Sequence, residues 1–231
     1  MSDLPPVFVI SLPGSQRREV IQRTLESIDL PFRFWDAVHG GKLSAEQIAS
    51  VDTDYTQREW GHGLSPGEIG CALSHITLYE HIRASAYEAA IVLEDDACPV
   101  AGFKEILITM LGKLPTRAEL AYLHHGKAKS WPIKRTLPHG LKLVRYRSPS
   151  AKSKRNIIST RGYWLSYKGA IKLLHQAYPV RMPSDYLTGY IQRSGIHAYG
   201  VEPNCLIEND SISEIDMISQ RQYGGHLQPK A

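Results

Sequence analysis

Short apolar runs alternate with amphipathic segments along the chain, and this alternation predicts an α/β protein. Apolar runs typical of buried strands occur at residues 7–12, 32–35, 89–93, 120–123 and 162–166. Helical spacing of apolar residues predicts helices at about residues 15–27, 65–85, 103–114, 168–177 and 184–193. We expect Ser184 to cap the last of these helices and Gly195 to end it. A strand–helix–strand opening of this kind predicts a central mixed, mostly parallel sheet flanked by helices.

The helix predicted at 65–85 has the clearest start signal in the chain. Ser65 suits the N-cap, Pro66 the first helical position, and Glu68 completes a capping box. Its buried face is predicted to consist of residues at i, i+3, i+4 and i+7, namely Ile69, Ala72, Leu73 and Ile76.

The bulk composition indicates one globular domain. The chain has 231 residues, of which 42% are hydrophobic and 22% are charged. We expect a single domain over residues 1–219 and a flexible tail over 220–231. The start of the chain lacks a signal-like pattern, and no apolar run approaches the roughly 18 residues of a membrane span. The three cysteines, Cys71, Cys98 and Cys205, are scattered, which favours a reducing, cytoplasmic compartment; we read Cys71 and Cys98 as packing residues.

A basic stretch lies in the middle of the chain. Residues 127–155 contain ten Lys or Arg and no acid; because the whole chain carries +4, the remainder carries −6. Such a stretch can attract phosphates, nucleic acid or an anionic membrane, or it can be a solvated loop. Trp131 and Tyr146 are interleaved with the charges, which also suits an acceptor-binding segment.

Three consecutive acids follow the apolar run at 89–93: Glu94, Asp95 and Asp96. Adjacent carboxylates repel one another unless a cation lies between them, and Mg²⁺ and Mn²⁺ favour carboxylate oxygens. The triplet therefore predicts a divalent metal site at a strand end, with an acidic turn in water as the alternative. Asp96, the outermost acid, is the expected direct ligand.

Other motifs point away from several enzyme classes. No Gly-x-x-x-x-Gly-Lys loop, Gly-x-Gly-x-x-Gly fingerprint or Gly-x-Ser-x-Gly elbow occurs. Asp52-Thr53-Asp54 matches a literal Asp-x-Asp pattern but follows a predicted helix, so it is the weaker metal candidate. His124 and His125 are adjacent on a predicted strand and should face opposite sides of the sheet, so they are not expected to be joint ligands.

Several blocks together resemble glycosyltransferase family 25, which includes bacterial lipooligosaccharide galactosyltransferases and collagen galactosyltransferases. The most specific block is Gly67-Glu68-Ile69-Gly70-Cys71-Ala72-Leu73-Ser74-His75. The other blocks are Val9-Ile10-Ser11-Leu12 with Arg17-Arg18, Asp36-Ala37-Val38-His39-Gly40, Leu93-Glu94-Asp95-Asp96, Gly162-Tyr163-Trp164-Leu165-Ser166 and Pro183-Ser184-Asp185. Their order and spacing are kept over most of residues 7–186.

The resemblance implies a GT-A-like fold and an inverting, metal-dependent hexosyltransferase. The donor would be UDP-galactose and the acceptor a lipooligosaccharide- or lipopolysaccharide-type glycan. Asp96 and Glu94 would hold Mn²⁺ or Mg²⁺, and Asp185 would be the catalytic base, although as an acid near a helix start it also suits the helix dipole. The expected donor-binding residues are Ser11, Leu12, Arg17, Ala37, Gly40, Ser74, His75, Glu94 and Asp95.

Two other functional classes stay open. The first is another metal-dependent phosphoryl enzyme, although the haloacid-dehalogenase pattern fails because Ala97 and Cys98 stand where its second Asp would be. The second is a non-catalytic protein that binds a glycan or nucleic acid through the basic stretch. For the glycosyltransferase we expect the glycan acceptor as partner, contact with the anionic inner face of the plasma membrane, and no nucleic acid.

Overall fold

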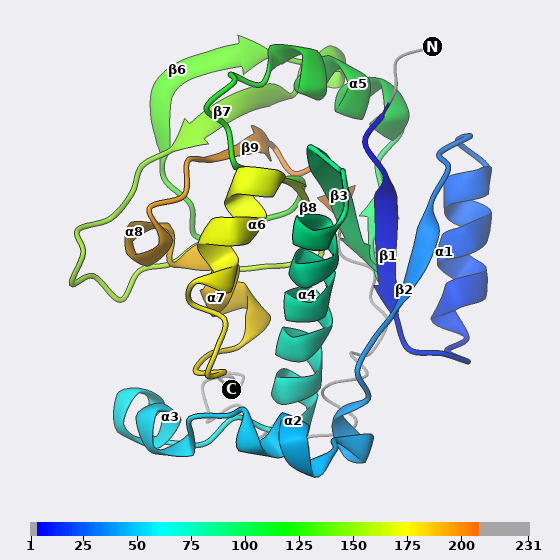
Figure 1. Ribbon diagram of the computed structural model, residues 1–231. Coiled ribbons are helices and arrows are strands. Elements are labelled where there is room, and N and C mark those ends of the chain that lie inside the picture. Colours follow the sequence, from blue (N-terminus) through cyan, green and yellow to red (C-terminus); the bar gives the residue numbers. More distant parts are fainter. Residues whose placement is uncertain (1–3, 208–231) are drawn as a thin grey trace, which may run out of the picture.

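The computed structural model describes residues 4–207 as a central sheet with helices on both faces (Figure 1). The strands are β1 (Val7–Ser11), β2 (Arg33–Asp36), β3 (Ala89–Glu94), β4 (Cys98–Pro99), β5 (Leu120–Tyr122), β6 (Ser130–Thr136), β7 (Lys142–Tyr146), β8 (Gly162–Ser166), β9 (Ala198–Glu202) and β10 (Leu206–Ile207). The helices are α1 (Arg17–Glu26), α2 (Ala45–Ala49), α3 (Thr53–Trp60), α4 (Pro66–Ala84), α5 (Phe103–Lys113), α6 (Tyr167–Leu174), α7 (Ser184–Gly189) and α8 (Ile191–Ser194), with 3-10 turns η1 (Gly40–Lys42) and η2 (Pro138–Gly140).

The main sheet has eight strands in the order β2-β1-β3-β8-β5-β9-β7-β6. Strand β1 pairs in parallel with β2 and β3, and β5 pairs in parallel with β9. The other four pairings are antiparallel. The predicted mixed sheet is therefore confirmed, but parallel pairing covers only three of its seven strand pairs.

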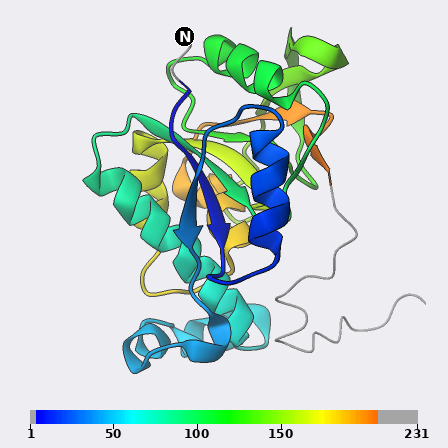
Figure 2. The ribbon, with the colours of Figure 1, turned by 90° about the vertical axis from the view of Figure 1, so that its right-hand side faces the viewer.

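Both faces of the sheet are buried, which explains the unbroken apolar runs. In β3, Ala90 and Val92 pack into the core under α4, α6 and α7, whereas Ile91 and Leu93 pack into the core under α1 and α5. Strand β1 alternates in the same way, with Val7 and Val9 on the α1 side. Figure 2 shows α1 and α4 on opposite sides of β1 and β2.

Helix α4 begins where the sequence predicts. Ser65 accepts a hydrogen bond from the Glu68 amide, and the Glu68 carboxylate accepts one from the Ser65 amide, so the capping box is formed. The predicted helices near 15–27, 103–114 and 168–177 correspond to α1, α5 and α6.

The predicted helix at 184–193 is wrong in two respects. It is divided into α7 and α8 at Tyr190, and Pro183, not Ser184, is its N-cap. The carbonyl of Gly189 accepts a hydrogen bond from the Ile157 amide, so a second segment packs at the break. A side chain at Gly189 would overlap the Ile157 carbonyl. Gly195 adopts the left-handed conformation and ends α8 as expected.

The basic stretch contains two strands that the sequence analysis did not predict. Strands β6 and β7 pair as an antiparallel hairpin at the edge of the sheet, with a register shift between Ser130 and Lys134. Six of the seven residues of β6 are exposed, so its apolar pattern is too weak to indicate a strand. The predicted tail at 220–231 lies outside the described residues. Within residues 4–207, no helix is long and apolar enough to cross a membrane.

Candidate active site

Parallel pairing brings three strand ends to one edge of the sheet. Ser11 at the end of β1 is in register with Asp36 at the end of β2, and Ile10 is in register with Glu94 at the end of β3. Ligands of α/β sheets commonly bind outside the carboxyl ends of such strands. Helix α4 covers this edge from one face of the sheet and adds the side chains of its first turns.

A cavity of about 120 Å³ opens at this edge. Its lining includes every residue expected to bind the donor or the metal: Ser11, Leu12, Arg17, Ala37, Gly40, Ser74, His75, Glu94, Asp95 and Asp96. Ile10, Val38, Gly67 and Cys71 complete the lining. The structure thus brings together residues that are up to 85 positions apart in the chain. Their individual roles stay predictions.

Asp95 is held by the first strand and first helix. Its Oδ2 atom accepts a hydrogen bond of 2.6 Å from the Ser11 hydroxyl, and its Oδ1 atom lies 3.5 Å from Nη1 of Arg17. Ser11 and Arg17, which were both expected to bind the donor, therefore contact the carboxylate of Asp95. Asp95 is held in place by the protein's own donors.

Asp96 is paired on one oxygen only. Its Oδ2 atom accepts hydrogen bonds from Nε and Nη2 of Arg161 at 3.3 and 3.2 Å. Its Oδ1 atom is buried and has no hydrogen-bond partner among the described residues. Burial and the nearby charge of Glu94 raise the pKa of Asp96, despite the opposing effect of Arg161. A buried carboxylate oxygen of this kind suits a cation ligand.

Glu94 ends a buried hydrogen-bond chain. Its Oε1 atom lies 3.1 Å from Nε2 of His75, and Nδ1 of His75 lies 2.7 Å from the hydroxyl of Tyr163. That hydroxyl is 2.8 Å from the hydroxyl of Tyr79. Burial alone would raise the pKa of Glu94. The hydrogen bond and charge of His75, together with the hydrogen bond of Thr160 and the charge of Arg161, outweigh burial and hold the pKa below its usual value. Glu94 is thus kept ionised beside Asp96.

Ser74 fixes the loop after β2 to helix α4. Its hydroxyl accepts a hydrogen bond of 2.8 Å from the Val38 amide and donates one of 2.6 Å to the Gly70 carbonyl. The close approach of loop and helix needs glycine on both sides, since a Cβ at Gly40 would lie 2.3 Å from the Pro66 carbonyl oxygen. A Cβ at Gly70 would lie 2.6 Å from the Val38 carbonyl oxygen. Ser74 and the glycines therefore shape one wall of the cavity.

Asp185 lies in the first turn of α7 and accepts a hydrogen bond of 3.1 Å from the Thr160 hydroxyl. Burial is the main reason that its pKa is raised, and the charge of Glu94 raises it further. A hydrogen bond links Thr160 with Ser184 at 3.3 Å, and another links Ser184 with Sγ of Cys71 at 3.1 Å. Asp185 is thereby connected to the α4 wall of the cavity, although it does not line the cavity itself.

Asp52, the first acid of the rival pair, has a structural role. Asp52 is the N-cap of α3, where it accepts a hydrogen bond from the Tyr55 amide and pairs with Arg181 at 2.8 Å. These two contacts lower its pKa, the Tyr55 amide most. The separation of the two histidines is also as expected. His124 accepts a hydrogen bond from Arg161, whereas the ring of His125 packs against Tyr146.

Three residues that the sequence analysis did not select contribute to this site. Arg161 pairs with Asp96, Thr160 donates to Asp185, and Tyr163 bonds His75. Thr160 and Arg161 directly precede β8, and Tyr163 is its second residue. This strand is antiparallel to β3, so its beginning lies beside the acidic end of β3. Arg161 was detectable as the cation that directly precedes the Gly162-Tyr163 block.

Comparison with known sequences agrees with this arrangement. The profile of "Glycosyltransferase family 25 (LPS biosynthesis protein)" matches residues 4–188, which include every residue of the candidate site from Ser11 to Asp185. The chain belongs to glycosyltransferase family 25.

Relatives in family 25 include active and inactive proteins. Procollagen galactosyltransferase 1-A of Xenopus laevis is 31% identical over 244 residues, which cover 94% of this chain and 38% of the relative. Inactive glycosyltransferase 25 family member 3 of Mus musculus is 28% identical over 224 residues, covering 85% of this chain and 36% of the relative. The family 25 chain thus spans well under half the length of these relatives.

Cys71, His75 and Glu94 of this family 25 chain could also hold a metal ion. Each offers one ligand atom, and these atoms lie within 4.8 Å of one another. This group shares Glu94 with the predicted Asp96 site. The geometry therefore supports metal binding at this edge of the sheet.

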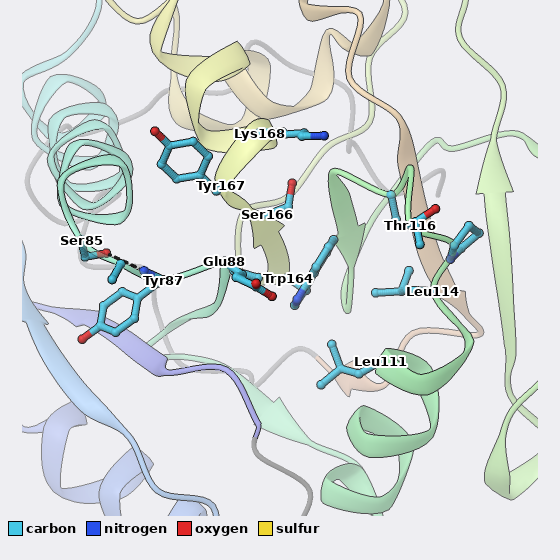
Figure 3. Close-up of a pocket in the computed structure, with 14 residues that line it drawn as sticks. Ser85, Tyr87, Glu88, Leu111, Leu114, Thr116, Trp164, Ser166, Tyr167 and Lys168 are labelled. Carbon is cyan, nitrogen blue, oxygen red and sulfur yellow. Dashed lines mark hydrogen bonds between the residues drawn. The ribbon is translucent and has the colours of Figure 1, made fainter.

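A larger cavity, of about 600 Å³, lies at the opposite end of the sheet (Figure 3). It is lined by the loop after α4, by the end of α5 and the loop after it, and by the end of β8. Leu111, Leu114 and Trp164 are among the lining residues (Figure 3). Glu88 and Lys168 are the ionisable side chains of its lining other than Tyr87 and Tyr167. The smaller cavity is lined by the carboxylates, histidine and arginine that group transfer needs. We therefore assign the smaller cavity as the candidate active site, on the chemistry of its lining and not on its volume.

Proposed function

We propose that this chain is an inverting, metal-dependent galactosyltransferase of the GT-A type. It would transfer galactose from UDP-galactose to a lipooligosaccharide- or lipopolysaccharide-type glycan. The observation that carries the proposal is the convergence of Glu94, Asp95 and Asp96 with the ends of β1 and β2 around one cavity. The galactosyltransferase relatives support the donor sugar, and the family description supports the acceptor class.

The residues present fit a divalent ion. The Oδ1 atom of Asp96 is buried and has no hydrogen-bond partner within residues 4–207. Glu94 beside it is held ionised. These two carboxylates would hold Mn²⁺ or Mg²⁺, which prefer oxygen ligands. When bound, such an ion neutralises the charge that develops on a leaving diphosphate. Arg161 keeps Asp96 in place by engaging its other oxygen.

The nucleotide would lie across the ends of β1 and β2. Ser11 and Arg17 orient Asp95 at this position, so that its carboxylate forms part of the wall that meets the donor. Ser74 orients the 37–40 loop by bonding the Val38 amide. These contacts fix the donor wall before the donor binds, which lowers the cost of ordering it.

Asp185 would take the proton from the acceptor hydroxyl. Burial raises its pKa and thereby makes its carboxylate a stronger base. The Thr160 hydroxyl holds the carboxylate in one orientation. The acceptor oxygen would then attack the anomeric carbon from the face opposite UDP, which inverts the configuration at that carbon.

A donor screen tests the proposal. The protein is incubated with Mn²⁺, a lipooligosaccharide acceptor and a panel of UDP-sugars, and both transferred sugar and released UDP are measured. We expect transfer with UDP-galactose above all other donors. Transfer with a different UDP-sugar would overturn the galactose assignment, and nuclease or phosphatase activity without transfer would overturn the proposed reaction.

The second candidate is a non-catalytic glycan-binding protein on the same fold. Relatives named as inactive glycosyltransferase 25 family members support this alternative. Calorimetry with UDP, with and without Mn²⁺, separates the two. Metal-enhanced UDP binding supports the enzyme, whereas glycan binding without affinity for UDP supports the binding protein.

A further inference from the structure

Three side chains of different ligand type meet at the inner end of the active-site cavity. Cys71 and His75 are four residues apart on α4 and so face the same side of the helix. Glu94 reaches them from the end of β3, with its Oε1 atom 3.1 Å from Nε2 of His75. The ligand atoms of all three lie within 4.8 Å of one another, and all three residues line the cavity. An ion in the cavity would have direct access to them.

The surroundings of His75 suit a metal ligand. Its ring is fully buried, and its Nδ1 atom lies 2.7 Å from the Tyr163 hydroxyl. Metal-bound histidines commonly use the second ring nitrogen for such a contact, which fixes the ring orientation. The hydroxyls of Tyr163 and Tyr79 are 2.8 Å apart, and either can donate. The Tyr163 hydroxyl can therefore accept a hydrogen bond from Nδ1–H. Nε2 can then give up the hydrogen that it shares with Glu94 and bind an ion in its place.

The chemistry of the three ligands selects the kind of ion. A thiolate and an imidazole are ligands for zinc-class ions, whereas Mg²⁺ and Mn²⁺ prefer an all-oxygen set. We propose that Cys71, His75 and Glu94 form a site for a thiophilic divalent ion of the zinc class, with its fourth position open to the cavity. Binding would release the thiol proton of Cys71 to solvent, because the thiolate is the ligand.

Glu94 is a proposed ligand both of this zinc-class ion and of the Mn²⁺ or Mg²⁺ of the donor complex, and it cannot bind both ions in one position. An ion on Cys71 and His75 would draw Glu94 away from Asp96, so zinc would inhibit galactose transfer. This consequence rests on the proposed function, whereas the binding site itself does not. The two parts are therefore tested by separate measurements.

Cobalt(II) tests the site without any sugar. Untagged protein is titrated with Co²⁺, which takes zinc sites and gives a thiolate-to-cobalt charge-transfer band in the near ultraviolet together with visible bands of tetrahedral cobalt. We expect one equivalent to produce both signals and Zn²⁺ to abolish them. The isosteric variant Cys71→Ser should lose the charge-transfer band and bind Co²⁺ at least about 10-fold more weakly.

Cys98→Ser is the matched control, because Cys98 is a partly exposed thiol outside this group. It should keep the full cobalt spectrum. Absence of the charge-transfer band in the wild-type protein, or its survival in Cys71→Ser, would overturn the site. Far-ultraviolet circular dichroism of Cys71→Ser checks that it is folded.

Zinc inhibition tests the consequence. Each variant's transfer rate is compared with its own zinc-free rate at fixed Mn²⁺. Zinc should inhibit wild-type protein and Cys98→Ser alike, and the zinc concentration for half inhibition should rise at least about 10-fold in Cys71→Ser. Equal inhibition of wild-type protein and Cys71→Ser would overturn the consequence. Cobalt binding in a protein that transfers no sugar would leave the site intact and refute only the proposed function.

Discussion

The Nε2 atom of His75 lies 3.1 Å from Oε1 of Glu94, and this contact joins the most specific sequence block of the chain to its acid triplet. The block forms the first turns of α4, and the triplet ends β3. Burial raises the pKa of Glu94, but His75, with Thr160 and Arg161, outweighs this effect and keeps the pKa low. An ionised carboxylate is thus maintained next to Asp96, where a donor-bound cation would need it.

The buried chain of hydroxyls behind His75 should contribute to stability. The Tyr163 hydroxyl bonds both His75 and Tyr79, and all three side chains are fully buried. In Tyr163→Phe, these two partners lose their hydrogen bonds without access to water. We expect the free energy of unfolding, measured by urea denaturation, to fall by about 1–3 kcal/mol.

Tyr167→Phe is the control for that variant. Tyr167 is 39% exposed, so removal of its hydroxyl should change the free energy of unfolding by less than about 0.5 kcal/mol. An equal effect of the two substitutions would show that the buried hydroxyl chain contributes nothing specific.

Contact between the 37–40 loop and α4 should be sensitive to one added methyl group. In Gly70→Ala the new Cβ would lie 2.6 Å from the Val38 carbonyl oxygen. The loop would have to move, so we expect unfolding free energy to fall by about 1–3 kcal/mol and UDP affinity to fall with it. Urea denaturation and calorimetry measure the two quantities.

Gly112→Ala provides the matched control. Gly112 lies in α5, and a Cβ there would contact nothing within 4 Å. Alanine favours a helix more than glycine does, so this variant should gain roughly 0.5–1 kcal/mol and keep its UDP affinity. Loss of UDP affinity in both variants would contradict the assignment of the loop to the donor wall.

Loss of the proposed base should affect turnover more than donor binding. Asp185→Asn keeps the shape of the side chain but cannot accept the acceptor's proton. We expect kcat to fall by about 10²–10⁴-fold with little change in the KM for UDP-galactose. Asp54→Asn, at an exposed position of α3, should have wild-type kinetics. Full turnover by Asp185→Asn would rule out the base.

The same substitution should change the pH dependence of stability in a defined direction. The pKa of Asp185 is raised by burial and by Glu94, so its ionisation at neutral pH destabilises the folded state. Relative to the unfolded chain, the group's stabilising contribution is full below the unfolded pKa near 3.8 and is lost as pH rises through the raised folded pKa. Asp185→Asn should therefore be more stable than wild type at pH 7, with the difference shrinking on acidification. Thermal unfolding across pH measures this; a variant that is less stable at pH 7 would contradict it.

The sequence predicted the part of the fold that follows from strong local patterns. The capping box at Ser65 and Glu68 and the doubly buried run at residues 89–93 both have strict physical requirements, and both are found. Strand β6 was missed because its side chains are mostly exposed, which removes the alternation that marks a strand. The break at Tyr190 depends on packing against Ile157, a contact between distant segments that local spacing cannot indicate.

The sequence predicted which residues line the candidate site, but not which other residues they contact. The acids were identifiable because adjacent carboxylates repel one another unless a cation lies between them. The α4 block was identifiable by its resemblance to family 25, and residues of both line one cavity. Arg161 as the partner of Asp96, and Tyr163 as the partner of His75, follow only from the antiparallel pairing of β8 with β3. Strand order in a sheet is decided by contacts between distant segments, so these partners became visible only in the structure.

The metal site at the end of β3 can be tested by measuring transfer of labelled galactose from UDP-galactose to lipooligosaccharide. Wild-type protein and Asp96→Ala are compared with Mn²⁺ and with a chelator. We expect transfer by wild-type protein with Mn²⁺, loss of transfer on chelation, and a decrease of about 10²-fold or more in Asp96→Ala even with Mn²⁺ present. Transfer that persists in the chelator, or that is equal in Asp96→Ala and wild-type protein, would contradict a metal site at the end of β3.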